Sequence, residues 1–346
     1  MQVLVTGGTG FIGAHLVKRL LSRGHQVTSL DKSPGLFDDE LQARGATLVS
    51  GSVTNAGDVQ RAMAGAELVY HLASPFGDIM QPDAVYWETE VNGTRNVLEA
   101  SARHSVRRVV HCSTQGVHGI ITEPPGDEDS PIAPLDYYCF SKAEGEKICQ
   151  EFLARGIDIV IVRPTSVYGP GDIRGWLKLY RMVARGWFLM IGDGRTLNHP
   201  VYVENLVDLF ELTATHPAAK GRTYLAGDEA PVTITELVQR VGVAIGTQVR
   251  ILRFPWYRIA SLGATAIEST SKLAGVRPTV FRRRLSWFKI NRGFRIDRAR
   301  SELGYEPRVR LSDGLARTAQ WYRSAGYLLD PGSRTTPSNV SNWRSP

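Results

Sequence analysis

The chain has few cysteines and no long apolar run, and each shortage excludes a class of protein. Three of its 346 residues are cysteine, an odd number without the spacing of metal ligands, so we expect no disulfide framework and no metal site. A membrane-spanning helix needs about 20 consecutive apolar residues, and stretches such as residues 157–162 are much shorter. The chain also opens without a basic region and a cleavage site. We therefore expect a cytoplasmic protein with reduced thiols, no secretory signal and no integral membrane segment.

The composition is otherwise that of a folded protein with an uneven charge. Hydrophobic residues make up 42% of the chain, which is enough to bury a core and excludes disorder for its bulk. Residues 251–346 hold 18 Lys and Arg against 6 Asp and Glu, so this part could face a phosphate-bearing substrate, an anionic membrane, nucleic acid or simply solvent. No nucleic-acid motif accompanies the charge, so we expect no nucleic-acid partner. The amphipathic residues 254–273 fit either a helix packed on the protein or contact with a bilayer.

Short apolar runs alternate with helical patterns through the first half of the chain. The alternation indicates an α/β fold with a doubly wound parallel sheet of the Rossmann type. Pro and Gly interrupt the second half, which still contains helical patterns. The expected strands are residues 3–6, 26–30, 47–50, 68–72, 108–112 and 158–162, and the expected helices are residues 11–23, 59–63, 91–104, 142–155, 176–184, 233–245 and 312–324.

This pattern divides the chain into two parts and a tail. We expect residues 1–165 to form the Rossmann domain. Residues 166–329 are expected to form a smaller, mostly helical C-terminal lobe that covers the carboxyl edge of the sheet, binds the substrate and returns a strand or two to the main sheet. Residues 330–346 are rich in Ser, Pro, Thr and Asn and should be a loose tail.

The first strand is followed at once by the sequence TGGTGFIG, residues 6–13. Between a strand and a helix, each of these glycines has a structural role. Gly7 allows a tight turn, Gly10 lets the backbone approach a pyrophosphate, and Gly13 lets the helix pack closely against the strand. The start of that helix also offers free N–H groups. Asp31 ends the second strand, where a carboxylate accepts both ribose hydroxyls and repels a 2′-phosphate. The motif predicts a bound dinucleotide, NAD rather than NADP, with the adjacent Lys32 softening that preference.

Tyr138 and Lys142 stand four residues apart, on one face of an expected helix. Tyrosine has a pKa near 10, but a neighbouring ammonium group and a nicotinamide ring favour the phenolate and lower that pKa. Tyr138 could then take the proton of a secondary alcohol while hydride leaves to NAD, or return it in reverse. Ser113 and Thr114 follow the fifth strand, where a hydroxyl can orient the substrate oxygen or merely cap the loop. Cys139 is either a reactive thiol or a packing residue.

Further stretches extend this pattern along the chain: YHLA (70–73), NGTRNV (92–97), STQGVHG (113–119), YCFSK (138–142), RP (163–164), VYGPG (167–171), VYVEN (201–205) and LGYEP (303–307). With them, roughly residues 1–325 resemble the extended short-chain dehydrogenases/reductases, also called the NAD-dependent epimerase/dehydratase superfamily. The resemblance implies Thr114 as the catalytic hydroxyl, Tyr138 as the acid/base, Lys142 as its partner, and a homodimer. Motifs and resemblance together place these residues at the cofactor: Gly7, Gly10, Phe11, Ile12, Gly13, Asp31, Lys32, Ser52, Val53, Leu72, Ala73, Ser74, Asn92, Tyr138, Lys142, Pro164 and Val167.

The chain departs from the family pattern at positions that bear on its ligands. Ser52 stands where the family commonly has an Asp that contacts adenine. Ser166 replaces an Asn that binds substrate phosphate in nucleotide-sugar members, and residues 198–200 replace an Arg-Asp pair. These differences make the chain look more like the 3β-hydroxysteroid dehydrogenase and dihydroflavonol-reductase branches.

Three functions fit these residues. The first is an NAD(P)-dependent oxidoreductase acting on a secondary alcohol or ketone of a fairly apolar small molecule. The alternative is an NAD-dependent nucleotide-sugar epimerase or dehydratase that keeps its NAD, in which Arg174, Arg195, Arg283 or Arg292 would hold a diphosphate. A non-catalytic NAD-binding scaffold is the third, and the presence of both Tyr138 and Lys142 argues against it.

Overall fold

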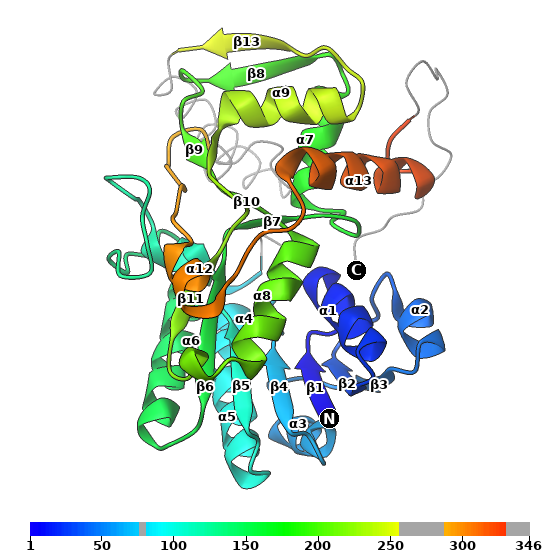
Figure 1. Cartoon of the computed structure of the whole chain (residues 1–346), viewed down its shortest axis with the longest axis vertical. Helices are drawn as coiled ribbons and strands as arrows, with labels where there is room; N and C mark the ends of the chain where they lie inside the picture. The colour runs from blue at the N-terminus through cyan, green and yellow to red at the C-terminus, as the bar shows by residue number, and fades with distance from the viewer. Residues whose placement is uncertain (76–80, 256–286, 330–346) are drawn as a thin grey trace.

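Seven parallel strands form the central sheet in the order β11-β6-β5-β4-β1-β2-β3 (Figure 1). This computed structural model describes residues 1–75, 81–255 and 287–329. From β1 the chain proceeds to β2 and β3 on one side and then to β4, β5 and β6 on the other, so the strand order reverses between β1 and β4. Ligands of open α/β sheets bind at the carboxyl ends of such a pair. The strands of the sheet are β1 (Gln2–Thr6), β2 (Gln26–Asp31), β3 (Thr47–Ser50), β4 (Leu68–His71), β5 (Arg108–Cys112), β6 (Ile159–Pro164) and β11 (Thr223–Ala226).

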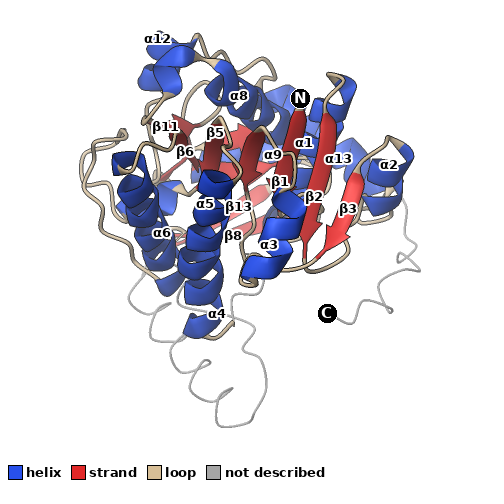
Figure 2. Ribbon diagram, turned by 90° about the horizontal axis from the view of Figure 1, so that it is seen from below, coloured by secondary structure: helices blue, strands red, loops and turns tan. Residues whose placement is uncertain are grey.

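Helices cover both faces of this sheet, which confirms the predicted doubly wound α/β fold (Figure 2). Side chains of a strand point alternately to its two faces, and along β1 Val3 and Val5 enter one core while Leu4 enters the other. Apolar side chains are therefore favoured on both faces of a strand, as the largely apolar runs indicated. One face carries α1 (Phe11–Ser22), α8 (Val203–Thr215) and α12 (Asp297–Leu303), and the other carries α3 (Ala56–Met63), α5 (Gly93–Arg103) and α6 (Tyr137–Ala154).

The second half of the chain adds a lobe with its own apolar core beyond the upper end of the sheet in Figure 1. Trp176, Tyr180 and Phe188 are buried in that core, so these lobe aromatics serve packing. A capping box of Thr233 and Glu236 fixes the start of one lobe helix. The lobe contains α7 (Gly175–Val183), α9 (Ile234–Ala244) and α13 (Leu311–Ser324), and the strand pairs β7 (Ser166–Tyr168) with β10 (Pro200–Tyr202), β8 (Trp187–Ile191) with β13 (Arg250–Phe254), and β9 (Leu197–Asn198) with β12 (Val232–Thr233).

Several helices begin earlier than the sequence pattern predicted. The helix expected from residue 142 starts at Tyr137, because the Asp136 side chain accepts a hydrogen bond from the Cys139 N–H at 2.9 Å and caps it. The helix expected from residue 91 is preceded by α4 (Asp83–Trp87) and by a π-helical turn, η1 (Glu88–Asn92). Helix α2 (Asp38–Ala43) was not predicted at all. Two short 3-10 turns complete the described elements, η2 (Gln115–His118) and η3 (Pro217–Ala219).

Some expectations fall on parts of the chain outside the described residues. These are the tail at residues 330–346, most of the amphipathic segment 254–273, and Arg283. Within the described ranges, no helix combines the length and the apolar character that crossing a membrane requires. The same ranges hold no group of three or more His, Cys, Asp or Glu side chains able to bind a metal ion together.

Candidate active site

The glycine turn after β1 is packed tightly on one side and open on the other. Gly7 has a φ of +72°, a conformation that suits glycine, and a Cβ there would lie 2.8 Å from the backbone of Ala73. A Cβ on Gly13 would overlap the Gly7 carbonyl oxygen. A Cβ on the exposed Gly10, in contrast, would approach only that carbonyl, at 3.2 Å. The open side of the turn is therefore at Gly10, where the backbone can approach a ligand.

The first turn of α1 has the features of an anion site. Gly10 is the N-cap residue and, as a glycine, supplies no side-chain cap to the N–H groups at the start of the helix. Phe11 and Ile12 are half-buried there. Free N–H groups and the positive end of the helix dipole suit a pyrophosphate. The turn therefore fits the diphosphate of a dinucleotide, with the N–H groups of this first turn as its donors.

Asp31 lies at the carboxyl end of β2, the neighbour of β1. One carboxylate oxygen, Oδ1, accepts a hydrogen bond from the Lys32 N–H at 2.8 Å, and the side chain is half-buried. This position fits a carboxylate that binds ribose hydroxyls. The Lys32 side chain is exposed.

Ser52 and Val53 form the loop after β3. The Ser52 N–H donates to Asp58 Oδ2 at 2.9 Å, and the Ser52 hydroxyl lies 2.8 Å from the Thr54 hydroxyl. Val53 is buried, and its carbonyl accepts a hydrogen bond from the Asn96 side chain at 2.9 Å. The polar groups of Ser52 are thus engaged within their own loop.

Residues 72–74 connect the glycine turn to the expected reactive groups. The Leu72 N–H donates to the Thr6 carbonyl at 3.0 Å, and Ala73 lies against Gly7. The Ser74 hydroxyl donates to Glu90 Oε1 at 2.6 Å. The segment therefore spans the distance from the turn at β1 to the helix that follows β4.

Tyr138 and Lys142 lie in the first two turns of α6, and Tyr138 contacts this segment directly. The Lys142 ammonium donates to the Cys112 carbonyl at 2.9 Å and pairs with Glu90 Oε2 at 2.7 Å. The Tyr138 phenol is half-buried, hydrogen-bonds Ser74, and packs on the Tyr86 ring with 5.9 Å between centroids. The structure thus brings Tyr138, Lys142 and Ser74 together and adds Glu90 to them.

The protein's own groups around Tyr138 act against the lowering of its pKa that we expected from Lys142 and the nicotinamide ring. Burial, and then the negative charge of Glu90, raise the pKa of the Tyr138 phenol well above 10, although the hydrogen bond to Ser74 opposes that rise. The sequence predicted a lowered pKa because it placed a lone ammonium beside the phenol. The buried carboxylate of Glu90 pairs with that ammonium and offsets its charge.

Of the two hydroxyls after β5, Thr114 alone is available for a substrate. Thr114 is half-buried, and its Oγ1 accepts a hydrogen bond from the Gly116 N–H at 3.1 Å, which leaves its own hydrogen to donate. Ser113 is buried and donates to Glu146, which also pairs with Arg163 at 2.6 Å. Ser113 therefore belongs to a structural network within the domain.

The three remaining residues expected at the cofactor are Asn92, Pro164 and Val167. The Asn92 side chain donates to Glu88 Oε2 at 2.9 Å, along its own helix. Pro164 is buried at the end of β6, and Val167 is half-buried in β7.

Cys139 packs against Gly116, since a Cβ on that glycine would lie 2.5 Å from the thiol sulfur. This contact accords with the packing role considered for the cysteine.

Glu90 is the residue of this site that sequence reasoning missed. It lies in the π-helical turn two residues before Asn92, and its side chain is fully buried. Local sequence gave no signal for it, because its burial and its pairing with Lys142 depend on packing between distant segments.

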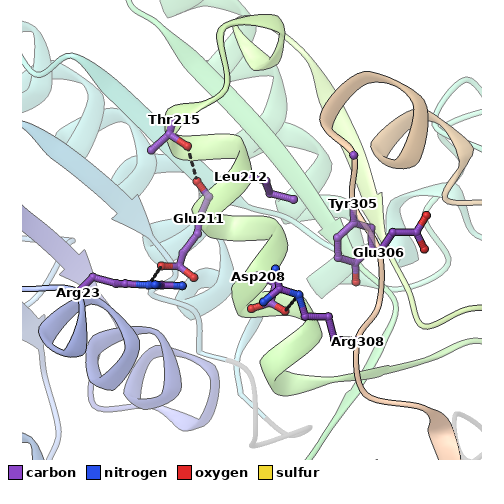
Figure 3. A pocket seen from close by; sticks show the side chains of 9 residues that line it. Arg23, Asp208, Glu211, Leu212, Thr215, Tyr305, Glu306 and Arg308 are labelled. Carbon is purple, nitrogen blue, oxygen red and sulfur yellow. Dashed lines mark hydrogen bonds and ion pairs between the residues drawn. The ribbon is translucent and has the colours of Figure 1, made fainter.

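A surface hollow of about 310 Å³ lies away from this site (Figure 3). It is lined in part by Arg23, which follows the C-terminal end of α1, and by Glu211 and Asp208 of α8. Ion pairs cross it, Arg23 to Glu211 at 3.3 Å and Arg308 to Asp208 at 3.9 Å. Because the glycine turn begins α1 and Arg23 follows its end, this hollow lies at the opposite end of the helix from the candidate active site.

Residues 3–227 match the protein family described as the NAD dependent epimerase/dehydratase family. Among curated proteins, the chain is 30% identical over 341 residues to a 3-beta-hydroxysteroid dehydrogenase of Mycolicibacterium neoaurum, covering 93% of this chain and 91% of that protein. It is 27% identical over 323 residues to an N-acetyl-alpha-D-glucosaminyl-diphospho-ditrans,octacis-undecaprenol 4-epimerase of Escherichia coli O157:H7, covering 92% of this chain and 95% of that protein.

Solved structures of enzymes are also similar to nearly the whole chain. The dTDP-glucose 4,6-dehydratase DesIV of Streptomyces venezuelae, with NAD and TYD bound, is 26% identical with a TM-score of 0.74, covering 94% of this chain and 97% of that one. The UDP-glucose 4-epimerase of Thermotoga maritima is 23% identical with a TM-score of 0.76, covering 94% and 99%, and this likeness concerns the fold alone.

Proposed function

The chain belongs to the NAD-dependent epimerase/dehydratase family, the extended short-chain dehydrogenases/reductases, and from this premise we propose that it oxidises a secondary alcohol, or reduces the ketone, of a fairly apolar small molecule. The observation that carries the proposal is the segment at residues 72–74. It contacts the glycine turn through Ala73 and the Tyr138 phenol through Ser74. A cofactor diphosphate on α1 and a reacting carbon beside Tyr138 then belong to one continuous site.

We propose NAD as the cofactor, held by the turn at residues 7–13, with Asp31 at the adenosine ribose. When bound, NAD supplies the hydride acceptor at its nicotinamide. The chain itself supplies the proton chemistry: Tyr138 exchanges a proton with the substrate oxygen, and Thr114 donates a hydrogen bond that orients it. The Lys142 ammonium is held in place by the Cys112 carbonyl and the Glu90 carboxylate, close to Tyr138 on the same helix.

Two observations favour an apolar substrate. Ile132 and Leu135, in the segment just before α6, are 47% and 52% exposed, so aliphatic surface lies only a few residues from Tyr138. Ser166 stands where nucleotide-sugar members have the phosphate-binding Asn, so the side-chain amide of that contact is absent at this position. The relative that is 30% identical is named a hydroxysteroid dehydrogenase, which supports this substrate class.

The second candidate is a nucleotide-sugar epimerase or dehydratase with tightly held NAD. The Escherichia coli relative is named a 4-epimerase and aligns with nearly the whole chain. Arg174 and Arg195 are exposed in the lobe, where a guanidinium could hold a diphosphate. The same Thr114, Tyr138 and Lys142 would serve this reaction, so these residues do not distinguish the two candidates.

The test begins with the purified protein and a denatured extract of it. A dehydrogenase should carry little NAD and should reduce added NAD with a hydroxysteroid or another apolar secondary alcohol. If the purified protein instead contains bound NAD and converts UDP- or dTDP-sugars, the second candidate is the correct function. Tyr138→Phe should lower the rate about 10²–10⁴-fold while keeping the ring contact with Tyr86. A protein without affinity for either dinucleotide would contradict both candidates.

We also propose a homodimer formed through the surface of α4 and α6. Phe140 is 39% exposed and lies beside two aromatic rings, stacked on Trp87 and tilted to Tyr137, with ring centroids 6.4 and 5.6 Å apart. Exposed aromatic clusters of this kind mark interfaces. Light scattering should find a dimer that Phe140→Asp converts to a monomer, and a monomeric wild-type protein would contradict the proposal.

A further inference from the structure

Glu90 places a negative charge where the fold gives it no contact with water. Its side chain is 0% exposed and that of Lys142 is 3% exposed, at an ion-pair distance of 2.7 Å. A buried pair of this kind contributes little net stability, because desolvation offsets the attraction between the charges. The carboxylate also lies in a π-helical turn, an irregularity that is frequent at functional sites. Net stability therefore does not account for a buried carboxylate at this position beside Tyr138.

The hydrogen bonds around Glu90 form a directed chain. The Ser74 hydroxyl donates its one hydrogen to Glu90 Oε1 at 2.6 Å. Ser74 is also hydrogen-bonded to the Tyr138 phenol; while the phenol is neutral and the Ser74 hydrogen is on Glu90, the phenol O–H is the donor in that bond. Every hydrogen then points from Tyr138 through Ser74 toward the carboxylate.

Tyr138 needs such a chain to act as a base. Burial and the charge of Glu90 raise the pKa of Tyr138 well above 10, so the phenolate is scarce at neutral pH. Burial likewise raises the pKa of Glu90 above 4.5, against the opposing influence of Lys142, and this makes the carboxylate a stronger base. A neutral phenol can accept a proton only if it gives up its own at the same time.

We propose that Glu90 is the proton acceptor behind Tyr138 and exchanges a proton with it through the Ser74 hydroxyl. This inference rests on the proposed function. In alcohol oxidation the substrate O–H proton passes to the Tyr138 oxygen, the Tyr138 proton to Ser74, and the Ser74 proton to Glu90. The electron pair of the broken O–H bond forms the carbonyl as the C–H hydrogen leaves with its own pair, as hydride, to nicotinamide. After product release the proton returns to solvent along the same route, and reduction runs in reverse.

The experiment compares Glu90→Gln and Ser74→Ala in the full chain by the pH profile of kcat for alcohol oxidation. At neutral pH both should lose about 10²–10⁴-fold, the usual contribution of a proton-transfer group. Glu90→Gln should regain activity as the pH rises, because its Lys142 is unpaired and favours the phenolate. Ser74→Ala keeps the ion pair and should not recover. Glu90→Asp should restore part of the neutral-pH rate.

A second measurement needs no turnover. The ultraviolet absorbance of phenolate, titrated with Tyr138→Phe as the blank, should give a lower pKa for Tyr138 in Glu90→Gln than in the wild type. Glu146→Gln is the matched control, since Glu146 is a buried carboxylate of α6 paired with Arg163. It should lose stability without altering the shape of the pH profile or the Tyr138 titration.

The outcomes separate the two proposals. If Glu90→Gln loses activity and Ser74→Ala keeps the wild-type profile, Glu90 only holds Lys142 and the relay is overturned. An unchanged Tyr138 titration in Glu90→Gln overturns it as well. If the wild type transfers no hydride from any alcohol, the proposed function fails, whereas the titration still tests the coupling between Glu90 and Tyr138.

Discussion

A Cβ atom on Gly7 would lie 2.8 Å from the backbone nitrogen of Ala73, so the turn after β1 and the segment after β4 are in direct backbone contact. Only a residue without a side chain permits this approach. The contact sets the position of Ser74 relative to the start of α1. The candidate cofactor turn and the proposed proton-transfer residues are therefore joined by a backbone contact that a residue larger than glycine at position 7 would disrupt.

The same close packing makes Gly13 a sensitive position for NAD binding. In Gly13→Ala the new methyl group overlaps the Gly7 carbonyl oxygen and lies 2.7 Å from Gly8 Cα, so α1 must shift away from the turn. A shift costing about 1–3 kcal/mol corresponds to roughly a 5–150-fold loss of affinity. Calorimetric titration with NAD measures it. Gly175→Ala is the matched control, because a Cβ there meets no atom within 4 Å, and it should bind NAD as the wild type does.

The main sheet could be predicted closely, and the reason lies in its strands. The strand over Arg108–Cys112 has the predicted bounds, and α1 ends one residue before the predicted end. Strands buried on both faces appear in the sequence as short, mostly apolar runs, so local sequence suffices to find them. Helix α3 begins at Ala56, three residues before the predicted start. Asn55, which caps it by accepting from the Gly57 and Asp58 N–H groups, was a readable signal.

The electrostatics of the site could not be predicted in the same way. Tyr138 and Lys142 were identified because their spacing is local. Glu90 pairs with Lys142 across 52 residues of sequence, and only the packing of η1 against α6 brings them together. The direction of the Tyr138 pKa shift depends on that contact and on burial, neither of which local sequence reports.

Asp31 should set the preference for NAD over NADP. Its carboxylate repels the 2′-phosphate of NADP, so Asp31→Ala should reduce the ratio of kcat/KM values for NAD and NADP at least about tenfold, a change of 1.4 kcal/mol. Asp39→Ala removes an exposed carboxylate of the neighbouring helix α2 and serves as the control. An unchanged ratio in Asp31→Ala would remove this residue from the ribose site.

Thr114 and Ser113 should respond differently to the loss of their hydroxyls. Thr114→Ala removes the donor to the substrate oxygen and should lower kcat about 10²–10³-fold, while Thr114→Ser should retain most activity. Ser113→Ala leaves Glu146 with one donor fewer and should cost about 1–3 kcal/mol of unfolding free energy. Its kcat should stay near that of the wild type. Steady-state kinetics and urea unfolding of the three variants give both quantities, and a kcat loss confined to Ser113→Ala would reverse the assignment.

Asp228 should make the stability of the protein fall between pH 4 and 6. The carboxylate is buried and accepts hydrogen bonds from the Tyr202 N–H at 2.9 Å and the Asn205 amide at 2.7 Å, and burial raises its pKa from 3.8 to about 6. The folded state thus holds a proton that the unfolded state has released. This contribution is fully present below pH 3.8 and is lost as the pH rises to about 6, up to about 3 kcal/mol in all.

Asp228→Asn keeps the acceptor oxygen and does not titrate. The unfolding free energy of the wild type relative to this variant, measured in urea at pH 4, 5, 6 and 7, should decrease with pH and then level off. A constant difference would show that Asp228 is ionised throughout.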